Sequence, residues 1–230
     1  MKKDKNVNKG CVYMSDISVI GIGNIGKLVI NKIAEYNNKV QTIYITKDGE
    51  EIKECYANII LNLSENLEKR LEQIIFRKRV FIVGHIGEKQ YNEINVQICK
   101  KLKKEGKEVN EICSFPFTFE GRSSLNSACD TIKILGEELN KLIVTDCDLI
   151  IKDIDKKTSI KEAFELVAEI LYSNLQDTFR KVEMKYQKVI VDHNEKCEEM
   201  RKMEMKVKGI SEELGNTCCL MMKKRKIREE

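Results

Sequence analysis

Hydrophobic residues in the first two thirds of the chain alternate between short continuous runs and longer segments with helical spacing. The runs are rich in β-branched and aromatic residues and predict strands at 17–20, 40–45, 80–83, 109–115 and 142–145. The segments between them predict helices at 27–36, 64–76, 92–104 and 125–139. Because parallel strands need helical crossovers, this order predicts an α/β fold, a Rossmann-like and mostly parallel sheet with helices on both faces.

The pattern changes after Ser159. From there to about Gln187 the chain holds no Gly or Pro, and apolar residues recur at spacings of three and four, which predicts one long helix. A short apolar run at 189–191 and a polar loop at 192–195 follow, and a further helix at 196–208 ends at a glycine. The long helix exceeds a normal crossover, so we expect it to form a central spine.

The only proline, Pro116, lies in the stretch Phe115-Pro116-Phe117-Thr118-Phe119-Glu120-Gly121. The alternating aromatic residues favour an edge strand, and Pro116 ends its pairing because proline has no backbone N–H. Glu120 and Gly121 are expected to open the next helix. Such a corner is either a structural turn beneath a loop or the rim of a ligand site.

Charges of the two signs nearly cancel, since 41 Lys and Arg face 37 Asp and Glu and leave a formal net charge of +4. This balance gives little support to a nucleic-acid role. Basic residues gather at 1–9 and 223–228, as is typical of solubilising tails. Beside the second cluster, Cys218 and Cys219 could support a weak contact with an anionic membrane.

The nine cysteines form no Cys-x-x-Cys pair, and His85 and His193 are the only histidines. We therefore expect no zinc site. His85 and His193 are interpreted as packing and loop residues rather than catalysts. No signal peptide or long apolar span stands out, so reduced thiols and a cytoplasmic location are expected.

The segment Gly21-Ile22-Gly23-Asn24-Ile25-Gly26 follows a predicted strand and opens a predicted helix. Glycines there let the backbone approach a phosphate, and the helix N-terminus supplies unpaired amides and partial positive charge. Taken alone, the segment favours an NAD-binding Rossmann unit with Asp48 as the ribose partner. That interpretation is one alternative.

Several weak motifs share the order found in one family. They are the glycine segment at 17–33, the strand at 80–82, the Pro116 corner, the strand and loop at 142–148, Ala163-Phe164 and the segment 191–209. In this order the chain resembles the FtsZ branch of the tubulin superfamily. The resemblance extends from about Ile17 to Gly209.

The resemblance implies four parts. A basic flexible tail at 1–14 precedes an FtsZ-like nucleotide-binding domain at 15–188, which includes the central helix. A synergy-type loop and its helix occupy 189–209, and a charged tail occupies 210–230. The family continues into a second sheet domain, which we expect to be missing.

The resemblance also implies a nucleotide site. Its phosphate-binding positions are Gly21, Gly23, Gly26 and Gly87, with Asn24 in the same glycine loop. Arg122 would substitute for the family's phosphate-binding arginine, whose position holds Ser124. Glu120 matches the acid that holds the ribose, Phe164 matches the aromatic residue that stacks on guanine, and Asp148 lies in the loop beside the base. Asp192 and Glu195 match catalytic acids that reach into the next subunit's pocket. The implied cofactor is GTP, with or without Mg²⁺, and the implied partner is another copy or a full-length FtsZ in a filament.

Several positions depart from the family pattern. The loop that should be a run of glycines and threonines reads Gly87-Glu88-Lys89-Gln90-Tyr91-Asn92-Glu93, and Ser124 replaces an arginine. Side chains in this loop crowd a phosphate, and acidic ones repel it. We therefore expect an FtsZ-like GTP-binding cytoskeletal or cell-division protein with weakened phosphate loops, and GTPase activity stays open. The alternatives are a non-hydrolysing relative that caps or modulates filaments, and an NAD-binding protein.

Overall fold

Six parallel strands form the centre of the protein. The computed structural model describes residues 16–36, 39–47, 52–63, 67–152, 155 and 157–181. The strands are β1 (Ile17–Ile22), β2 (Gln41–Thr46), β3 (Ile59–Asn62), β4 (Arg79–His85), β5 (Glu108–Phe115) and β6 (Lys141–Asp146). Their order in the sheet is β3-β2-β1-β4-β5-β6, and every neighbouring pair is parallel. The predicted α/β fold is confirmed.

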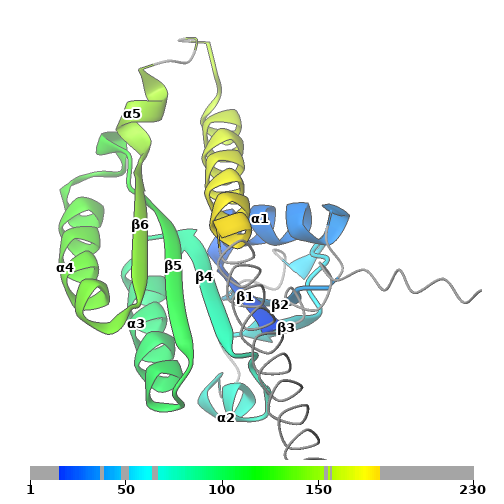
Figure 1. Cartoon of the computed structure of the whole chain (residues 1–230). Coiled ribbons are helices and arrows are strands. Elements are labelled where there is room, and N and C mark those ends of the chain that lie inside the picture. The colour runs from blue at the N-terminus through cyan, green and yellow to red at the C-terminus, as the bar shows by residue number, and fades with distance from the viewer. Residues whose placement is uncertain are drawn as a thin grey trace, which may run out of the picture. The chain divides into compact units, whose positions relative to one another are not determined.

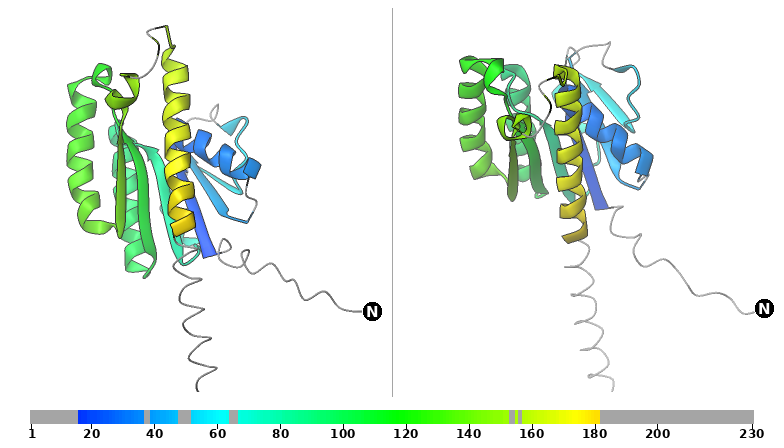
Figure 2. Two further views of the ribbon diagram at one scale, coloured as in Figure 1. Left: turned by 45° about the horizontal axis from the view of Figure 1, so that its top comes forward. Right: turned by 90° about the horizontal axis from the view of Figure 1, so that it is seen from above.

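Helices cover both faces of the sheet (Figures 1 and 2). They are α1 (Gly23–Tyr36), α2 (Leu67–Glu72), α3 (Lys89–Lys104), α4 (Arg122–Glu138), the short α5 (Cys147–Ile151) and a long helix of which residues 160–181 are described. In the figures, α1 and helix 160–181, drawn in yellow, lie on one face, and α3 and α4 lie on the other. Such double coverage is the normal solution for a parallel sheet.

Two hydrophobic clusters hold these layers together because successive strand residues point to opposite faces. In β1, which is buried along its whole length, Val19 packs on the face of α1 and helix 160–181, and Ile20 packs on the face of α2 and α3. In β4, Phe81 lies on the first face and meets Phe179 of the long helix edge-on, with ring centroids 5.1 Å apart. The long helix is therefore part of the core.

Two sequence expectations in the region before β4 were wrong. Strand β3, which pairs with β2, was missed because its short run carries a polar residue and lies in a stretch without helical or strand periodicity. The helix expected to reach Phe76 ends at Glu72, where the amides of Gln73 and Ile74 bond carbonyls three residues back. Phe76 instead enters the core from a loop. Ser64, the first residue of the expected helix, lies outside the described residues.

The edge-strand interpretation of the Pro116 corner was also wrong. Strand β5 pairs with both β4 and β6 and is therefore an inner strand. Its pairing ends at Phe115, as expected for a strand before proline, and the 3₁₀ turn Thr118–Glu120 leads into α4. Phe117 lies beyond the strand and is fully buried in the core.

An ionisable side chain, Glu111 of β5, is buried beneath α3. Its Oε1 accepts a hydrogen bond of 2.7 Å from Asn95 Nδ2, whereas its Oε2 has no hydrogen-bond partner among the described residues. Burial raises the pKa of Glu111 from 4.5 to about 7, although the hydrogen bond from Asn95 acts in the opposite direction. The carboxylate form is thus costly in this position.

The part of the chain after residue 181 is not described, so several expectations stay predictions. They concern the end of the long helix at Gln187, the segment 189–209 and the tail 210–230. Within the described residues, none of the helices combines the length and apolarity needed to span a membrane.

Candidate functional site

The sheet has a switch point between β1 and β4. From β1 the chain continues to β2 on one side, and from β4 it continues to β5 on the other. In open parallel sheets a crevice forms at the carboxyl ends of such a strand pair, and ligands bind there. In this protein Gly23 follows β1 and the loop around Gly87 follows β4. Residues from both loops, from the Pro116 corner and from helix 160–181 meet at this edge.

Two glycines of the first loop are required by packing. A Cβ atom added at Gly21 would lie 2.6 Å from the carbonyl oxygen of Gly26, and one added at Gly26 would lie 2.6 Å from the carbonyl carbon of Gly21. Real Cβ atoms do not approach so closely, so the backbones of β1 and α1 touch directly here. Both glycines therefore have a structural role whether or not a phosphate binds.

The third glycine, Gly23, has a φ of +66° and lies against the ring of Tyr91. A Cβ atom on Gly23 would be 3.1 Å from Tyr91 Cε2. Tyr91 is itself buried, and its hydroxyl oxygen accepts a hydrogen bond of 3.4 Å from the backbone amide of Lys47. The Lys47 ammonium lies 5.4 Å from the Tyr91 ring centroid and forms an ion pair with Glu88, the residue before α3. Side chains thus cover the glycine loop.

A hydrogen-bonded chain joins Ser114, His85 and Glu120 at the ends of β4 and β5. His85 Nδ1 lies 2.8 Å from Ser114 Oγ, and His85 Nε2 lies 2.9 Å from Glu120 Oε2. The other carboxylate oxygen of Glu120 accepts a bond of 2.8 Å from the amide of Phe117. Ser114 is fully buried, whereas the side chains of His85 and Glu120 are 16% and 20% exposed. The chain therefore runs from the interior to the surface.

The charge of Glu120 fixes the direction of these bonds. Burial raises the pKa of Glu120, but the hydrogen bond and charge of His85 and the amide of Phe117 lower it by more, so it lies below its ordinary value. An ionised carboxylate only accepts hydrogen bonds, so His85 Nε2 carries the proton. In a neutral ring Nδ1 then accepts from the Ser114 hydroxyl.

The loop after β4 approaches the same place. A Cβ atom added at Gly87 would lie 2.6 Å from Ser124 Oγ, 2.9 Å from His85 Nε2 and 3.2 Å from Glu120 Oε2. Ser124 also donates a hydrogen bond of 3.1 Å to the Gly87 carbonyl. A side chain at Gly87 would have to push aside the ends of these three side chains, so the glycine lets the loop lie close to the histidine and the carboxylate.

An aromatic residue of the long helix, Phe164, closes the other side. Its ring meets His85 edge-on at 5.8 Å and Phe117 edge-on at 5.3 Å, and Phe164 is half-buried. Asp148 of α5 accepts hydrogen bonds from the amide of Thr118, at 2.9 Å, and from its hydroxyl. These bonds lower the pKa of Asp148. They tie α5 to the corner, so Asp148 stands in a short helix rather than in the expected loop.

The structure therefore brings together part of the predicted site. Glu120, Gly87 and Phe164 converge, with Asp148 next to them through Thr118. Asn24 and Arg122 are exposed in the first turns of α1 and α4. Asp192, Glu195 and Asp48 lie outside the described residues.

Sequence reasoning missed two members of this site, His85 and Tyr91. A polar residue that ends a buried strand is a recognisable signal, and His85 is the last residue of β4. No comparable signal marks Tyr91, whose contact with Gly23 joins two distant segments. Among the described residues no cluster of three His, Cys, Asp or Glu side chains could hold a metal ion.

No protein-family model matches the sequence. Among solved structures, an FtsZ mutant from M. jannaschii is similar at 19% identity and a TM-score of 0.62, over 69% of this chain and 54% of that chain. A CetZ from Methanosaeta thermophila is similar at 18% identity and a TM-score of 0.61, over 72% and 54%. TubZ from Bacillus thuringiensis, solved as GDP-form protofilaments, is similar at 14% identity and a TM-score of 0.53, over 71% and 53%.

The chain spans about half the length of these relatives. The matches agree with the six-stranded parallel sheet and the long helix described above. The described part of the chain therefore has the fold of FtsZ, CetZ and TubZ, which are members of the tubulin/FtsZ superfamily.

Proposed function

We propose that this chain is an FtsZ-like cytoskeletal protein that recognises a guanine nucleotide mainly through its base and sugar. The observation that carries the proposal is the convergence of Glu120, Gly87 and Phe164 at the switch point of the sheet. The fold supports it, since a TubZ with the same fold was solved as GDP-form protofilaments. A role in cell division within the cytoplasm is part of the proposal.

The sugar and base positions fit their ligands. Glu120 uses one acceptor position on each carboxylate oxygen, for His85 and Phe117, and an ionised carboxylate has about four. Acceptor positions thus remain for sugar hydroxyls. The half-exposed ring of Phe164 offers an apolar surface on which a base can stack. His85 holds Glu120 in place, so we assign it a positioning role.

The phosphate positions fit less well. The Tyr91 ring lies where a phosphate would approach Gly23, and the Glu88 carboxylate stands at the N-terminus of α3, next to Lys47. A helix N-terminus attracts anions, and Glu88 already supplies one there. A triphosphate would have to displace a buried ring and compete with this carboxylate.

These contacts favour the second candidate function, a non-hydrolysing subunit. In this version the chain docks on subunits of a filament and caps or modulates it without turning over GTP. Asp192 and Glu195, the acids that would act in hydrolysis, would face the pocket of a neighbouring subunit and not the pocket of this chain. They are therefore part of the same proposal. Sedimentation with polymerising FtsZ tests it, and we expect co-pelleting and shorter filaments. Unchanged filament length at equimolar protein would sink this candidate.

Calorimetric titration with GTP, guanosine and NAD tests nucleotide recognition. We expect guanosine to bind within about tenfold of GTP, because the triphosphate adds few favourable contacts, and NAD to bind more weakly than either. Glu120→Gln should weaken both guanine ligands by about tenfold, the cost of a charge-assisted hydrogen bond. Glu137→Gln, an exposed change on α4, is the matched control.

Three outcomes would contradict the proposal. Absence of guanosine and GTP binding would remove the nucleotide function. GTP binding much tighter than guanosine binding would show that the phosphates are recognised in spite of Tyr91. Preference for NAD would favour the dinucleotide alternative.

A further inference from the structure

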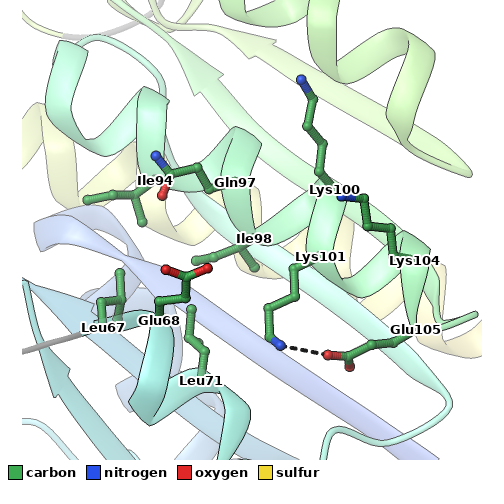
Figure 3. A pocket seen from close by; sticks show the side chains of 10 residues that line it. All are labelled: Leu67, Glu68, Leu71, Ile94, Gln97, Ile98, Lys100, Lys101, Lys104 and Glu105. Carbon is green, nitrogen blue, oxygen red and sulfur yellow. Dashed lines mark ion pairs between the residues drawn. The ribbon is translucent and has the colours of Figure 1, made fainter.

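A groove lies between α2 and α3 (Figure 3). It has a volume of about 710 Å³. Leu71 and Ile98 form a buried floor, and Leu67 and Ile94 are half-buried beside them. Each helix contributes its pair at a spacing of four residues, so the two pairs face each other along the groove. This shape suits the apolar stripe of a third helix.

One wall of the groove is basic. Lys100, Lys101 and Lys104 come from the last turns of α3 and lie to one side of the Ile94–Ile98 stripe. Lys101 forms an ion pair of 2.8 Å with Glu105, shown as a dashed line in Figure 3. Lys100 and Lys104 are exposed and make no ion pair with the described residues. Glu68 of α2 also lines the groove and Glu105 neutralises Lys101, so the positive charge of this wall is that of Lys100 and Lys104. An occupant with acidic residues on the α3 side of its apolar stripe would therefore complement the wall.

The chain itself carries such a surface on helix 160–181. Leu166 and Ile170 are half-buried at a spacing of four residues, and Glu162, Glu165 and Glu169 lie on one side of them. Leu166 lines two hollows, of about 460 and 560 Å³, that flank the helix. The helix therefore stands as a ridge between two hollows, with acidic residues along one flank.

The ion pairs of Glu165 and Glu169 are weak enough to be exchanged. Glu165 lies 3.9 Å from Lys161, and Glu169 lies 3.2 Å from Lys32, with side chains 50% and 60% exposed. Exposed pairs of this kind contribute about 0–1 kcal/mol. Binding of the ridge to lysines on another molecule would replace them at little cost.

We propose that the acidic ridge of one copy, centred on Leu166 and Ile170, docks into the basic groove between α2 and α3 of a second copy. Groove and ridge lie on opposite faces of the sheet, since α2 and α3 pack on one face and helix 160–181 packs on the other. The contact is heterologous, so each added copy leaves a free groove at one end and a free ridge at the other. Copies therefore stack face to face into an open row. The inference is independent of nucleotide binding.

Reciprocal charge reversal in the full chain tests this contact. Lys100→Glu with Lys104→Glu makes the groove acidic, and Glu165→Lys with Glu169→Lys makes the ridge basic. Each double variant should self-associate about tenfold or more weakly than the wild type, because two attractions become repulsions. An equimolar mixture should associate again, since the acidic groove of one variant receives the basic ridge of the other.

Sedimentation velocity at low and high salt measures the association, which should weaken with salt. Lys133→Glu with Lys141→Glu changes exposed residues on α4 and β6 by the same total charge and should associate like the wild type. Thermal unfolding checks that each variant is folded.

Three results would overturn the proposal. A wild-type chain that stays monomeric at its highest soluble concentration has no such contact. Association that survives both double variants uses another surface. Loss in each variant without recovery in the mixture shows that groove and ridge do not meet.

Discussion

The buried carboxyl of Glu111 should make the free energy of unfolding depend on pH. Glu111→Gln replaces the carboxyl by an amide of the same shape, which can still accept the hydrogen bond from Asn95. The amide resembles the protonated carboxyl and carries no charge. The variant therefore removes only the cost of holding a carboxylate in the core.

The size of that cost follows from the pKa. Burial raises the pKa of Glu111 from 4.5 to about 7, and one pKa unit corresponds to about 1.4 kcal/mol, so the full cost is about 3 kcal/mol. Below pH 4.5 both the folded and the unfolded chain hold the proton, and the cost vanishes. Between pH 4.5 and 7 the unfolded chain binds fewer protons than the folded one, so the free energy of unfolding falls as pH rises. Above pH 7 the cost is complete.

Urea unfolding monitored by circular dichroism across this pH range measures the difference. The free energy of unfolding of Glu111→Gln should exceed that of the wild type by about 3 kcal/mol at pH 8 and by little at pH 4. Glu137→Gln, on the exposed side of α4, should follow the wild type throughout. Equal pH dependence of Glu111→Gln and the wild type would show that Glu111 does not hold its proton in the folded chain, and the reasoning would fail.

Three further experiments test other parts of the structure. Gly26→Ala should lower the free energy of unfolding by at least about 2 kcal/mol, because its Cβ would collide with the Gly21 backbone. Gly136→Ala should raise it by about 0.5–1 kcal/mol, because Gly136 has open space around it inside α4. Urea unfolding measures both. Burial raises the pKa of the Cys147 thiol to about 12. After alkylation at pH 8, mass spectrometry should therefore find Cys147 unmodified and the exposed Cys129 modified. Equal modification of the two cysteines would contradict this. Tyr91→Ala should raise the affinity for GTP relative to guanosine by opening the phosphate side, and Tyr91→Phe, which keeps the ring, should not.

Local pattern was sufficient to predict most of the fold. Strands β1, β2, β4 and β6 are rich in β-branched residues, and the helices carry regular apolar stripes. Strand β3 has only four residues, and its identity depends on pairing with β2, which no local pattern reveals. The status of β5 as an inner strand likewise depends on β6, which lies about thirty residues further along.

The candidate site, too, could be predicted from the sequence only in part. Glu120 and Gly87 could be proposed because they match positions of the FtsZ family that the chain resembles. The bonds of His85 to Ser114 and Glu120 could not, since they join residues 29 and 35 positions apart. The glycine loop is the sharpest case, because Gly23 has the expected conformation and a different neighbour, the ring of Tyr91. A sequence motif specifies where the backbone can be approached, and tertiary packing decides what approaches it.

Two aromatic contacts fasten helix 160–181 to a single strand. Near its start Phe164 meets His85, the last residue of β4, and near the end of its described part Phe179 meets Phe81 of the same strand. A packed helix can slide along its neighbour in a shear motion only if its contacts re-form together. Here a slide would break both ring pairs at once, so the helix and β4 move as one rigid unit. Any rearrangement at the candidate site must therefore shift the far end of the sheet core as well.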